Sequence, residues 1–201
     1  MQIRQKGMLL VISGPSGAGK GTLEQKLLLE DKSFRFSVSA TTRARRSCET
    51  EGVHYYFLSD ARFDELLKED AFLEHAVVHG HRYGTLKSQV YESISRGENV
   101  LLDIDPQGAR SVMEREKECV TVFILPPSYK ELENRLHTRN TDDPTEIQRR
   151  LFNARGEIEQ LSKYQYALVN DDLEQAYRQL VCIVNAEKQR TIRFFPTVPE
   201  E

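Results

Sequence analysis

The chain has 201 residues, of which 39% are hydrophobic, and its 28 basic and 31 acidic residues leave a net charge of -3. This length and apolar content suffice for one globular domain with a substantial core. The near balance of charge excludes a strongly basic protein, so we predict no nucleic-acid partner and no anionic membrane surface as partner.

The first apolar run, "MLLVIS" at 8–13, is short. A secretory signal needs roughly 7–15 apolar residues and a membrane span about 20, so neither is expected here. Continuous rather than alternating apolarity is typical of a strand buried on both faces. Cys48, Cys119 and Cys182 are far apart in the sequence, which favours free thiols in a reducing compartment. We therefore expect a cytoplasmic protein.

A glycine-rich segment, "GPSGAGK", follows this strand directly. It matches G-x-x-x-x-G-K at Gly14, Gly19 and Lys20, between a predicted strand and a predicted helix. Bare glycines let backbone amides wrap a phosphate, and the lysine adds charge for the terminal phosphates. A plain glycine-rich turn is the alternative. The predicted triphosphate site comprises Gly14, Pro15, Ser16, Gly17, Ala18, Gly19, Lys20, Gly21 and Thr22.

Gly21 occupies the position after the lysine, where a serine or threonine usually contacts Mg²⁺. The hydroxyl comes one residue later, at Thr22. We therefore expect nucleotide phosphates and water to hold the metal, with no direct protein ligand. Asp103 and Asp105, in "LLDID" at the end of a buried strand, are the expected carboxylates behind that water. They could instead begin the turn before Pro106.

Further continuous apolar runs at 99–105, 119–125 and 166–170 predict three more buried strands. Between the strands, apolar residues recur three or four positions apart among charges, which predicts helices. The expected helices are "GTLEQKLLLED" at 21–31, "GARSVMEREKE" at 108–118, "PSYKELENRLHTR" at 127–139 and "DDLEQAYRQLVCIVNAEKQR" at 171–190. Strands that alternate with helices predict an α/β fold with a parallel sheet flanked by helices.

Two segments interrupt this alternation. Residues 33–83 are rich in expected strands, "FRFSVSATTR", "VHYYFLS" and "AFLEHAVV", around one helix, "DARFDELLKED". We predict that they form a small insertion in a core made of 1–32 and 84–201. Residues 137–150, "HTRNTDDPTEIQRR", are rich in arginine and turn-forming residues, the composition of a mobile lid. The whole chain, 1–201, is expected to be one domain.

The insertion also gathers hydroxyl and guanidinium groups that suit a second phosphate. They are Ser37, Ser39, Thr41, Thr42, Arg43, Arg45 and Arg46. Tyr55 and Tyr83 add phenolic donors. On residues alone other interpretations stay open, because arginine runs are often only a solvated charged face. A triphosphate site could equally serve a GTPase, a motor or a kinase.

Taken in order, the segments "VISGPSGAGKGTL", "FSVSATTRARR", "FLEHA", "YGT", "LLDIDPQG" and "VNDDLEQAY" resemble the successive motifs of guanylate kinases, over about residues 8 to 190. The resemblance implies a P-loop NTPase core with a GMP-binding insertion and a lid. It also implies transfer of the γ-phosphoryl group of ATP to GMP, with Mg²⁺, for purine nucleotide metabolism and GMP recycling. The products would be ADP and GDP, and dGMP is a further expected acceptor.

The same resemblance implies a role for each matching residue. GMP would be bound by Ser39, Arg43, Arg46, Tyr55, Glu74, Tyr83, Thr85 and Asp103. The catalytic cations would be Lys20, Arg43 and the lid residues Arg135, Arg139 and Arg150. Asn170 would lie near the adenine of ATP, although it could also be an ordinary residue of a strand-ending turn.

Glu74 is the residue that the resemblance places, with Thr85, at the base. Guanine presents N1–H and its N2 amino group as adjacent donors, which an ionised carboxylate accepts together. Adenine has an acceptor at N1 and no N2 amino group, so a carboxylate at this position favours GMP over AMP. No catalytic histidine is required, because phosphoryl transfer needs positioning and cationic stabilisation.

The chain departs from the family pattern between its two phosphate-binding arginines. Ala44 and Arg45 stand where many relatives would show a threonine and a proline, so a less stiff loop is expected. Two other functions stay possible: a kinase-like scaffold that binds proteins, and a related kinase with another acceptor. Intact Lys20 argues against the first and Glu74 against the second. The C-terminal "FFPTVPEE" could dock on the core or form a subunit contact.

Overall fold

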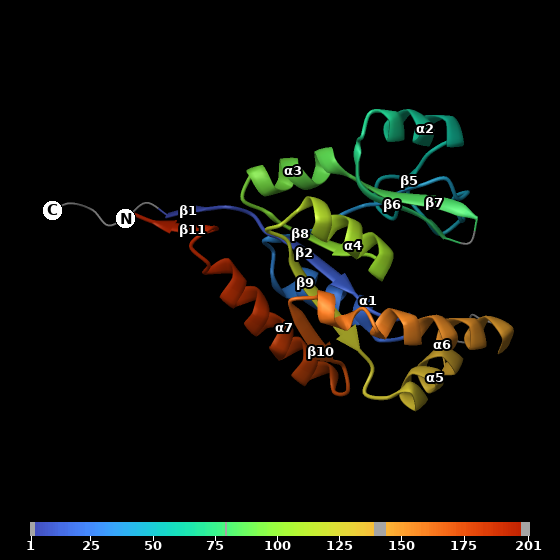
Figure 1. The fold of residues 1–201 in the computed structure, drawn as a ribbon. Helices are drawn as coiled ribbons and strands as arrows, with labels where there is room; N and C mark the ends of the chain where they lie inside the picture. Colours follow the sequence, from blue (N-terminus) through green and yellow to red (C-terminus); the bar gives the residue numbers. More distant parts are fainter. Residues whose placement is uncertain (1–2, 79, 139–143, 198–201) are drawn as a thin grey trace.

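The computed structural model describes residues 3–78, 80–138 and 144–197. Its centre is a five-stranded sheet in the order β10-β9-β2-β8-β3, in which every neighbouring pair is parallel (Figure 1). Its strands are β2 (Leu9–Ser13), β3 (Phe34–Phe36), β8 (Asn99–Asp103), β9 (Val120–Leu125) and β10 (Tyr166–Val169). The predicted α/β class with a parallel sheet is therefore confirmed.

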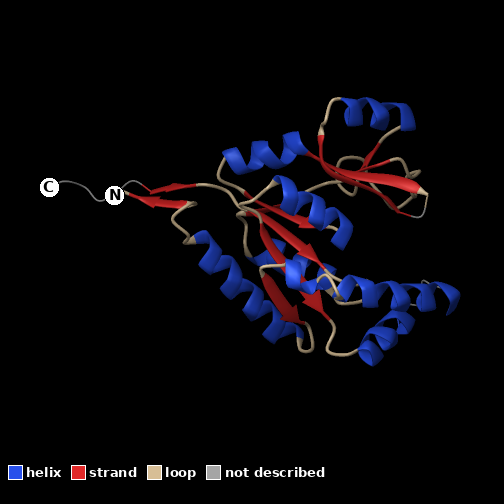
Figure 2. Ribbon diagram, viewed as in Figure 1, coloured by secondary structure: helices blue, strands red, loops and turns tan. Residues whose placement is uncertain are grey.

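Helices cover both faces of this sheet (Figure 2). They are α1 (Lys20–Glu30), α3 (Lys87–Ser95), α4 (Pro106–Arg115) and α7 (Leu173–Lys188). Side chains alternate along a strand, so Leu10 and Ile12 pack in the apolar cluster under α1 and α7, whereas Leu9 and Val11 pack under α3 and α4. Burial on both faces explains why the strand sequence is apolar without alternation.

A second, four-stranded sheet has the order β5-β4-β7-β6. Its elements are β4 (Ala40–Thr41), β5 (Tyr56–Phe57), β6 (Phe72–Val78) and β7 (His81–Leu86), with α2 (Asp60–Lys68) beside them. The rings of Phe63 on α2 and Phe72 on β6 stack with centroids 4.4 Å apart. With Ala40 and Leu66 they form an apolar cluster separate from the central one. The insertion therefore has a small core of its own.

The predicted boundaries of the insertion need correction. One strand was expected over 34–43, but the structure has two strands in different sheets. Phe36 of β3 pairs with Leu101 of β8 in the central sheet, whereas Ala40 of β4 pairs with Gly84 of β7. Residues 34–36 therefore belong to the core, and the second sheet runs past residue 83 to the end of β7. Strands β3 and β4 enter different sheets because they pair with different, distant strands, β8 and β7.

Two further helices, α5 (Tyr129–Thr138) and α6 (Pro144–Ile158), pack on each other through Leu132, Leu136, Ile147 and Ala154. Part of the predicted lid, 144–150, is thus the start of α6, which was not predicted as a helix. Its signal is a proline in the first turn followed by apolar residues three or four apart. Arg139 lies outside the described residues.

The C-terminal segment pairs with the N-terminal one. Strand β1 (Ile3–Gln5) runs antiparallel to β11 (Phe194–Pro196), and this ribbon projects from the core (Figure 1). At its base Arg193 is only 2% exposed and donates hydrogen bonds to Glu187 and to the carbonyl of Glu118. Residues 194–196 of "FFPTVPEE" therefore pair with the N-terminal strand of the same chain, and the subunit contact raised for this tail stays a prediction.

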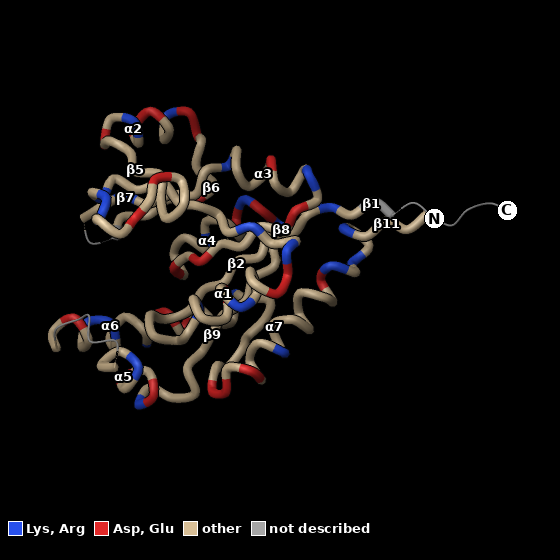
Figure 3. The backbone as a smooth tube through the Cα atoms, turned by 180° about the vertical axis from the view of Figure 1, so that it is seen from behind, with Lys and Arg blue, Asp and Glu red and all other residues tan. Residues whose placement is uncertain are grey.

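Charged residues of both signs are interspersed along the chain (Figure 3). Within the described ranges, no helix combines the length and apolarity that a membrane span requires. The carboxyl ends of the central strands point toward the side where the second sheet and the α5–α6 pair both lie (Figure 1). In parallel α/β sheets ligands bind at this edge, where β2 ends at Ser13 and β8 ends at Asp103.

Candidate active site

Residues 14–19 form the predicted phosphate-binding loop between β2 and α1. Gly14, Gly17 and Gly19 have φ angles of 136°, 94° and 89°, which favour glycine. A Cβ on Gly14 would lie 2.2 Å from the carbonyl oxygen of Ile124, so no larger residue fits. No side chain caps the start of α1, and its first turn has no acidic residue. The amides there are suited to an anion.

Lys20, the first residue of α1, folds over this loop. Its Nζ donates to the carbonyl oxygen of Gly14 at 2.7 Å and lies 4.0 Å from Oδ1 of Asp103. The ammonium thus faces a cavity of about 430 Å³ that the loop shares with Asp103, Asp105 and Glu157. One cation and three carboxylates therefore surround the position where phosphate would bind.

Glu24 lies one helical turn after Lys20 and is 4% exposed. Burial, followed by the neighbouring charge of Asp103, raises its pKa to about 8. Burial likewise raises the pKa of Asp103, which Lys20 opposes. In the described part of the chain, Oε1 of Glu24 has no hydrogen-bond partner. Glu24 is absent from the predicted site, although its position between the apolar residues Leu23 and Leu27 on α1 is a detectable signal.

We expect Glu24→Gln to raise the melting temperature, with a gain that grows between about pH 5 and pH 8. A carboxyl whose pKa is higher folded than unfolded binds its proton more tightly in the folded state. Its stabilising contribution is complete below the unfolded pKa near 4.5 and is lost as pH rises to about 8. Glutamine does not titrate, so the variant lacks this slope. Melting curves across that pH range, with exposed Glu30→Gln as control, test this; a pH-independent difference would contradict it.

A second cavity, of about 520 Å³, lies on the other side of the loop. Asn170, at the end of β10, lines it and donates from Nδ2 to the carbonyl oxygen of Ala18 at 2.9 Å. A Cβ on Gly19 would lie 2.2 Å from that nitrogen. Asn170 thus holds the loop. Thr22 lines this same cavity, whereas Gly21 lines the cavity of Asp103 and Asp105.

Two of the predicted lid arginines lie against the loop. Nη1 of Arg135, on α5, donates to the carbonyl oxygen of Asn170 at 3.0 Å, and Nε donates to Glu131. Nη1 of Arg150, on α6, donates to Oγ of Ser16 at 2.9 Å. Cations from two helices therefore flank the phosphate-binding loop.

The predicted acceptor-phosphate residues form a cluster in the insertion. Nη2 of Arg43 donates to Glu49 at 2.6 Å, and its guanidinium lies 5.3 Å from the centroid of the Tyr55 ring. The rings of Tyr55 and Tyr83 meet edge to face at 5.9 Å. This hydrogen bond to Glu49 is the main cause that raises the pKa of Arg43. Arg43, Tyr55 and Tyr83, all predicted, therefore lie together. Glu49 belongs to the same cluster but was not predicted from the sequence.

Ser39 and Arg46 are joined to this region only through their backbones. The carbonyl oxygen of Ser39 accepts from the amide of Tyr56 at 2.9 Å, and the amide of Arg46 donates to Glu49 at 2.8 Å. The side chain of Arg46 is exposed and forms no ion pair among the described residues. The structure thus places both residues beside the cluster without bringing their side chains into it.

Glu74 and Thr85, the predicted base readers, pair across β6 and β7. Oγ1 of Thr85 donates to Oε1 of Glu74 at 2.7 Å, and Glu74 is 6% exposed. Burial raises the pKa of Glu74, Thr85 lowers it, and Asp105 raises it again. A Cβ on Gly108 would lie 2.9 Å from Oε2 of Glu74 and 3.1 Å from Oδ1 of Asp105. Gly108 on α4 therefore makes room for two carboxylates.

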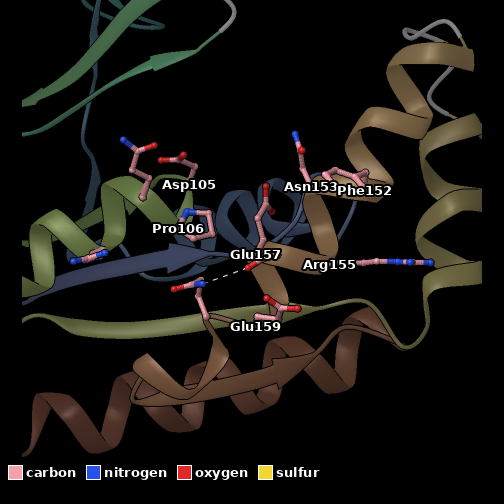
Figure 4. A pocket seen from close by; sticks show the side chains of 11 residues that line it. Asp105, Pro106, Phe152, Asn153, Arg155, Glu157 and Glu159 are labelled. Carbon is pink, nitrogen blue, oxygen red and sulfur yellow. Dashed lines mark hydrogen bonds between the residues drawn. The ribbon is translucent and has the colours of Figure 1, made fainter.

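Asp105 also caps α4, because its side chain accepts from the amide of Gly108 at 2.9 Å. The turn that was the alternative for Asp105 is therefore present, and the carboxylate still lines the cavity of Lys20. An adjoining cavity of about 730 Å³ between α4 and α6 shares Asp105 and Glu157 (Figure 4). Figure 4 shows Glu157 projecting from α6 toward Asp105 and Pro106. Glu157 is another site residue missed from sequence.

These groups suit a transfer between two anions. The loop, with Lys20 and the helix arginines, has the amides and positive charge that suit one phosphate chain, and the Arg43 cluster has the charge that suits a second phosphate. The buried carboxylate of Glu74 is able to accept hydrogen bonds from donors on a bound molecule. Positioned cations around a moving phosphoryl group lower its barrier without a general base.

Comparisons with known proteins agree. A family model described as guanylate kinase matches residues 6–187. A guanylate kinase of Caldanaerobacter subterraneus subsp. tengcongensis is 46% identical over 193 residues, covering 96% of this chain and 94% of the relative. One from Clostridium tetani is 48% identical over 189 residues, covering 94% and 90%. A crystal structure of guanylate kinase from Anaplasma phagocytophilum matches with a TM-score of 0.77 at 34% identity, covering 96% and 92%.

Proposed function

The chain belongs to the guanylate kinase family, and we propose from that premise how its own residues transfer the γ-phosphoryl group of ATP to GMP. The expected family and reaction are confirmed by relatives that match nearly the full length of the chain. The protein is an ATP:GMP phosphotransferase. The roles of individual residues, given next, are proposals.

On the ATP side, the triphosphate occupies the loop of residues 14–22, and Lys20 contacts its terminal phosphates. The support is the open start of α1 together with the ammonium held above the loop. The adenine occupies the cavity lined by Thr22 and Asn170, which is separate from the cavity of Asp103 and Asp105. Arg135 and Arg150 bring positive charge to the phosphates, in line with their present contacts on either side of the loop.

Mg²⁺ fits the carboxylate side of the loop. Asp103 and Asp105 line the cavity of Lys20, and oxygen ligands suit this ion. Gly21 offers no hydroxyl, and among the described residues no three Asp, Glu, His or Cys side chains are grouped to hold a metal directly. Phosphate oxygens and water would hold the ion there, and Asp103 and Asp105 would orient that water. When bound, Mg²⁺ neutralises charge on the β- and γ-phosphates.

On the acceptor side, the buried carboxylate of Glu74 is the observation that carries GMP as the substrate. Its Oε1 accepts from Thr85, and space at Gly108 leaves its Oε2 beside Asp105. N1–H and the N2 amino group of guanine supply the donors that such a carboxylate needs. The phosphate of GMP is bound by Arg43, Tyr55 and Tyr83. Arg46 and Ser39 lie beside this cluster. Asp103 lies between GMP and the phosphates of ATP. The same contacts accommodate dGMP.

Catalysis consists of bringing the two phosphates into line among cations. The insertion and the α5–α6 lid face the same edge of the central sheet and close over the substrates, which excludes water from the γ-phosphoryl group. The charge that spreads over its oxygens is then stabilised by Lys20, Arg43, Arg135, Arg139 and Arg150.

We also propose a cytoplasmic location. It is supported by the free thiols of Cys48, Cys119 and Cys182, which suit a reducing compartment.

The assay that tests this function measures ADP release from ATP and Mg²⁺ with GMP, dGMP, AMP, CMP and UMP offered separately. Turnover with the two guanine nucleotides alone is the expected result. Turnover with AMP, CMP or UMP would contradict the role of Glu74. Absence of turnover with every acceptor, in a protein that melts cooperatively, would favour a scaffold that binds other proteins.

A further inference from the structure

We propose that Glu49 positions Arg43 for the phosphate of GMP and so sets the affinity for the acceptor. This inference rests on the proposed function, because it concerns the same acceptor site. Glu49 does not bind the substrate itself. It acts through the guanidinium that does.

Glu49 connects a side chain to the backbone of the same loop. Its Oε1 accepts from Nη2 of Arg43 at 2.6 Å, while its Oε2 accepts from the amide of Arg46 at 2.8 Å. Its own amide donates back to the carbonyl oxygen of Arg46 at 3.1 Å. One carboxylate therefore closes the segment 43–49 and determines where the Arg43 guanidinium lies.

The ion pair is largely shielded from water. The side chain of Arg43 is 15% exposed and that of Glu49 is 10% exposed. The hydrogen bond from Arg43 is the main cause that lowers the pKa of Glu49 to about 2, so the carboxylate is ionised at physiological pH. Charge-assisted bonds between arginine and carboxylate are short and directional, and shielding preserves their strength.

Further contacts determine the plane of the guanidinium. Nη1 of Arg43 donates to the carbonyl oxygen of Ala44 at 2.9 Å. The Tyr55 and Phe57 ring centroids lie 5.3 Å and 5.9 Å from the guanidinium carbon. A guanidinium has five N–H groups, and the two hydrogen bonds to Glu49 and Ala44 use two of them. The others serve a phosphate that binds beside Tyr55 and its neighbour Tyr83.

The loop has few other means of holding this geometry. Ala44, Arg45 and Arg46 are exposed, so their side chains contribute little packing. No proline stiffens the segment between the two arginines. An arginine that is free to sample many rotamers must lose that freedom when a ligand binds, whereas a preorganised one has lost it already. Because Glu49 already orders Arg43 in the folded protein, less rotamer freedom is lost when the ligand binds.

Glu49→Gln distinguishes this positioning role from a merely structural role and from competition between Glu49 and the phosphate. The amide keeps the shape and can still accept from Arg46, but it loses the charge that holds Arg43. We expect GMP to bind about tenfold more weakly to the variant by calorimetry. Guanosine, which has no phosphate for Arg43 to bind, should inhibit both proteins equally. The KM for GMP should rise while the KM for ATP stays unchanged.

Two variants serve as references. Glu65→Gln removes an exposed ion pair with Arg62 on α2, in the same insertion, and should leave all these quantities unchanged. Glu49→Asp keeps the charge but is too short to reach both Arg43 and the amide of Arg46. It should bind GMP with an intermediate affinity, and it replaces Glu49→Gln if that variant does not fold.

A double-mutant cycle with Arg43→Ala tests whether Glu49 acts through the guanidinium. If it does, Glu49→Gln should not weaken GMP binding further once Arg43 is absent. Equal losses for GMP and guanosine would show a merely structural role, and tighter GMP binding would show that Glu49 competes with the phosphate. Either result, or additive losses in the cycle, overturns the inference. A wild-type protein that binds no GMP would overturn the proposed function as well.

Discussion

Lys20→Ala is expected to lower kcat about 10³-fold with little change in fold. The ammonium stabilises charge on the phosphates more in the transition state than in the bound substrate, and loss of such a group typically costs 10²–10³ in rate. Loop structure should survive, because it depends on glycine backbone angles and on the hydrogen bond from Asn170 to Ala18. The variant also loses the contact of Lys20 with Gly14, which is replaceable by water.

The measurement is steady-state ADP formation with GMP, together with a melting curve for each protein. Lys32→Ala is the matched control, because Lys32 is exposed just beyond α1 and only caps the carbonyl oxygen of Leu28. The control should retain the wild-type kcat. A Lys20→Ala variant whose kcat stays within about tenfold of wild type would exclude the lysine from the transfer step.

Glu74→Gln is expected to lower kcat/KM for GMP about 10²-fold and to leave that for AMP nearly unchanged. The amide turns one acceptor into a donor, which then faces a donor of guanine without a partner. Ionised Glu74 is required for binding, and burial raises its pKa above the ordinary 4.5. GMP affinity should therefore fall as pH decreases through that raised pKa, because the protonated carboxyl loses one acceptor.

The ratio of kcat/KM for GMP to that for AMP, measured from about pH 5 to pH 8, tests both statements. The variant should lack the part of the acidic fall in GMP affinity that comes from Glu74. Glu69→Gln, an exposed glutamate just after α2, is the control and should match wild type. If the ratio is the same in Glu74→Gln as in wild type, Glu74 does not read the base, and the specificity must come from elsewhere.

The phosphate-binding loop and the buried strands were predictable from the sequence, because both depend on residues that are close together in the chain. The loop depends on positive φ angles at Gly14 and Gly17 and on a first turn of α1 without an acidic residue. Both are properties of a few consecutive residues, and G-x-x-x-x-G-K encodes them. Continuous apolar runs encode strands covered on both faces, so β2 and β8 were expected where they are. The motifs along the chain identified the family, which the relatives confirm.

Pairing between distant segments was not predictable in this way. Strand β3 joins the central sheet and β4 joins the second sheet. The choice depends on partners that are distant in the chain, Leu101 for Phe36 and Gly84 for Ala40, rather than on local propensity. The ribbon of β1 and β11 joins the two ends of the described chain for the same reason. The roles assigned to single residues, including Arg139 outside the described ranges, stay predictions.

The sequence by itself determined the phosphate loop, the buried strands and the family, whereas the residues that it assigns to each substrate stay predictions. Only the tertiary structure added three further acidic residues to those predicted around the site. Glu24, Glu49 and Glu157 read as ordinary charged residues in the sequence. The fold buries Glu24 beside Asp103, pairs Glu49 with Arg43, and directs Glu157 toward Asp105. Burial and neighbouring charge determine what a carboxylate does, and both come from segments that only the folded chain brings together.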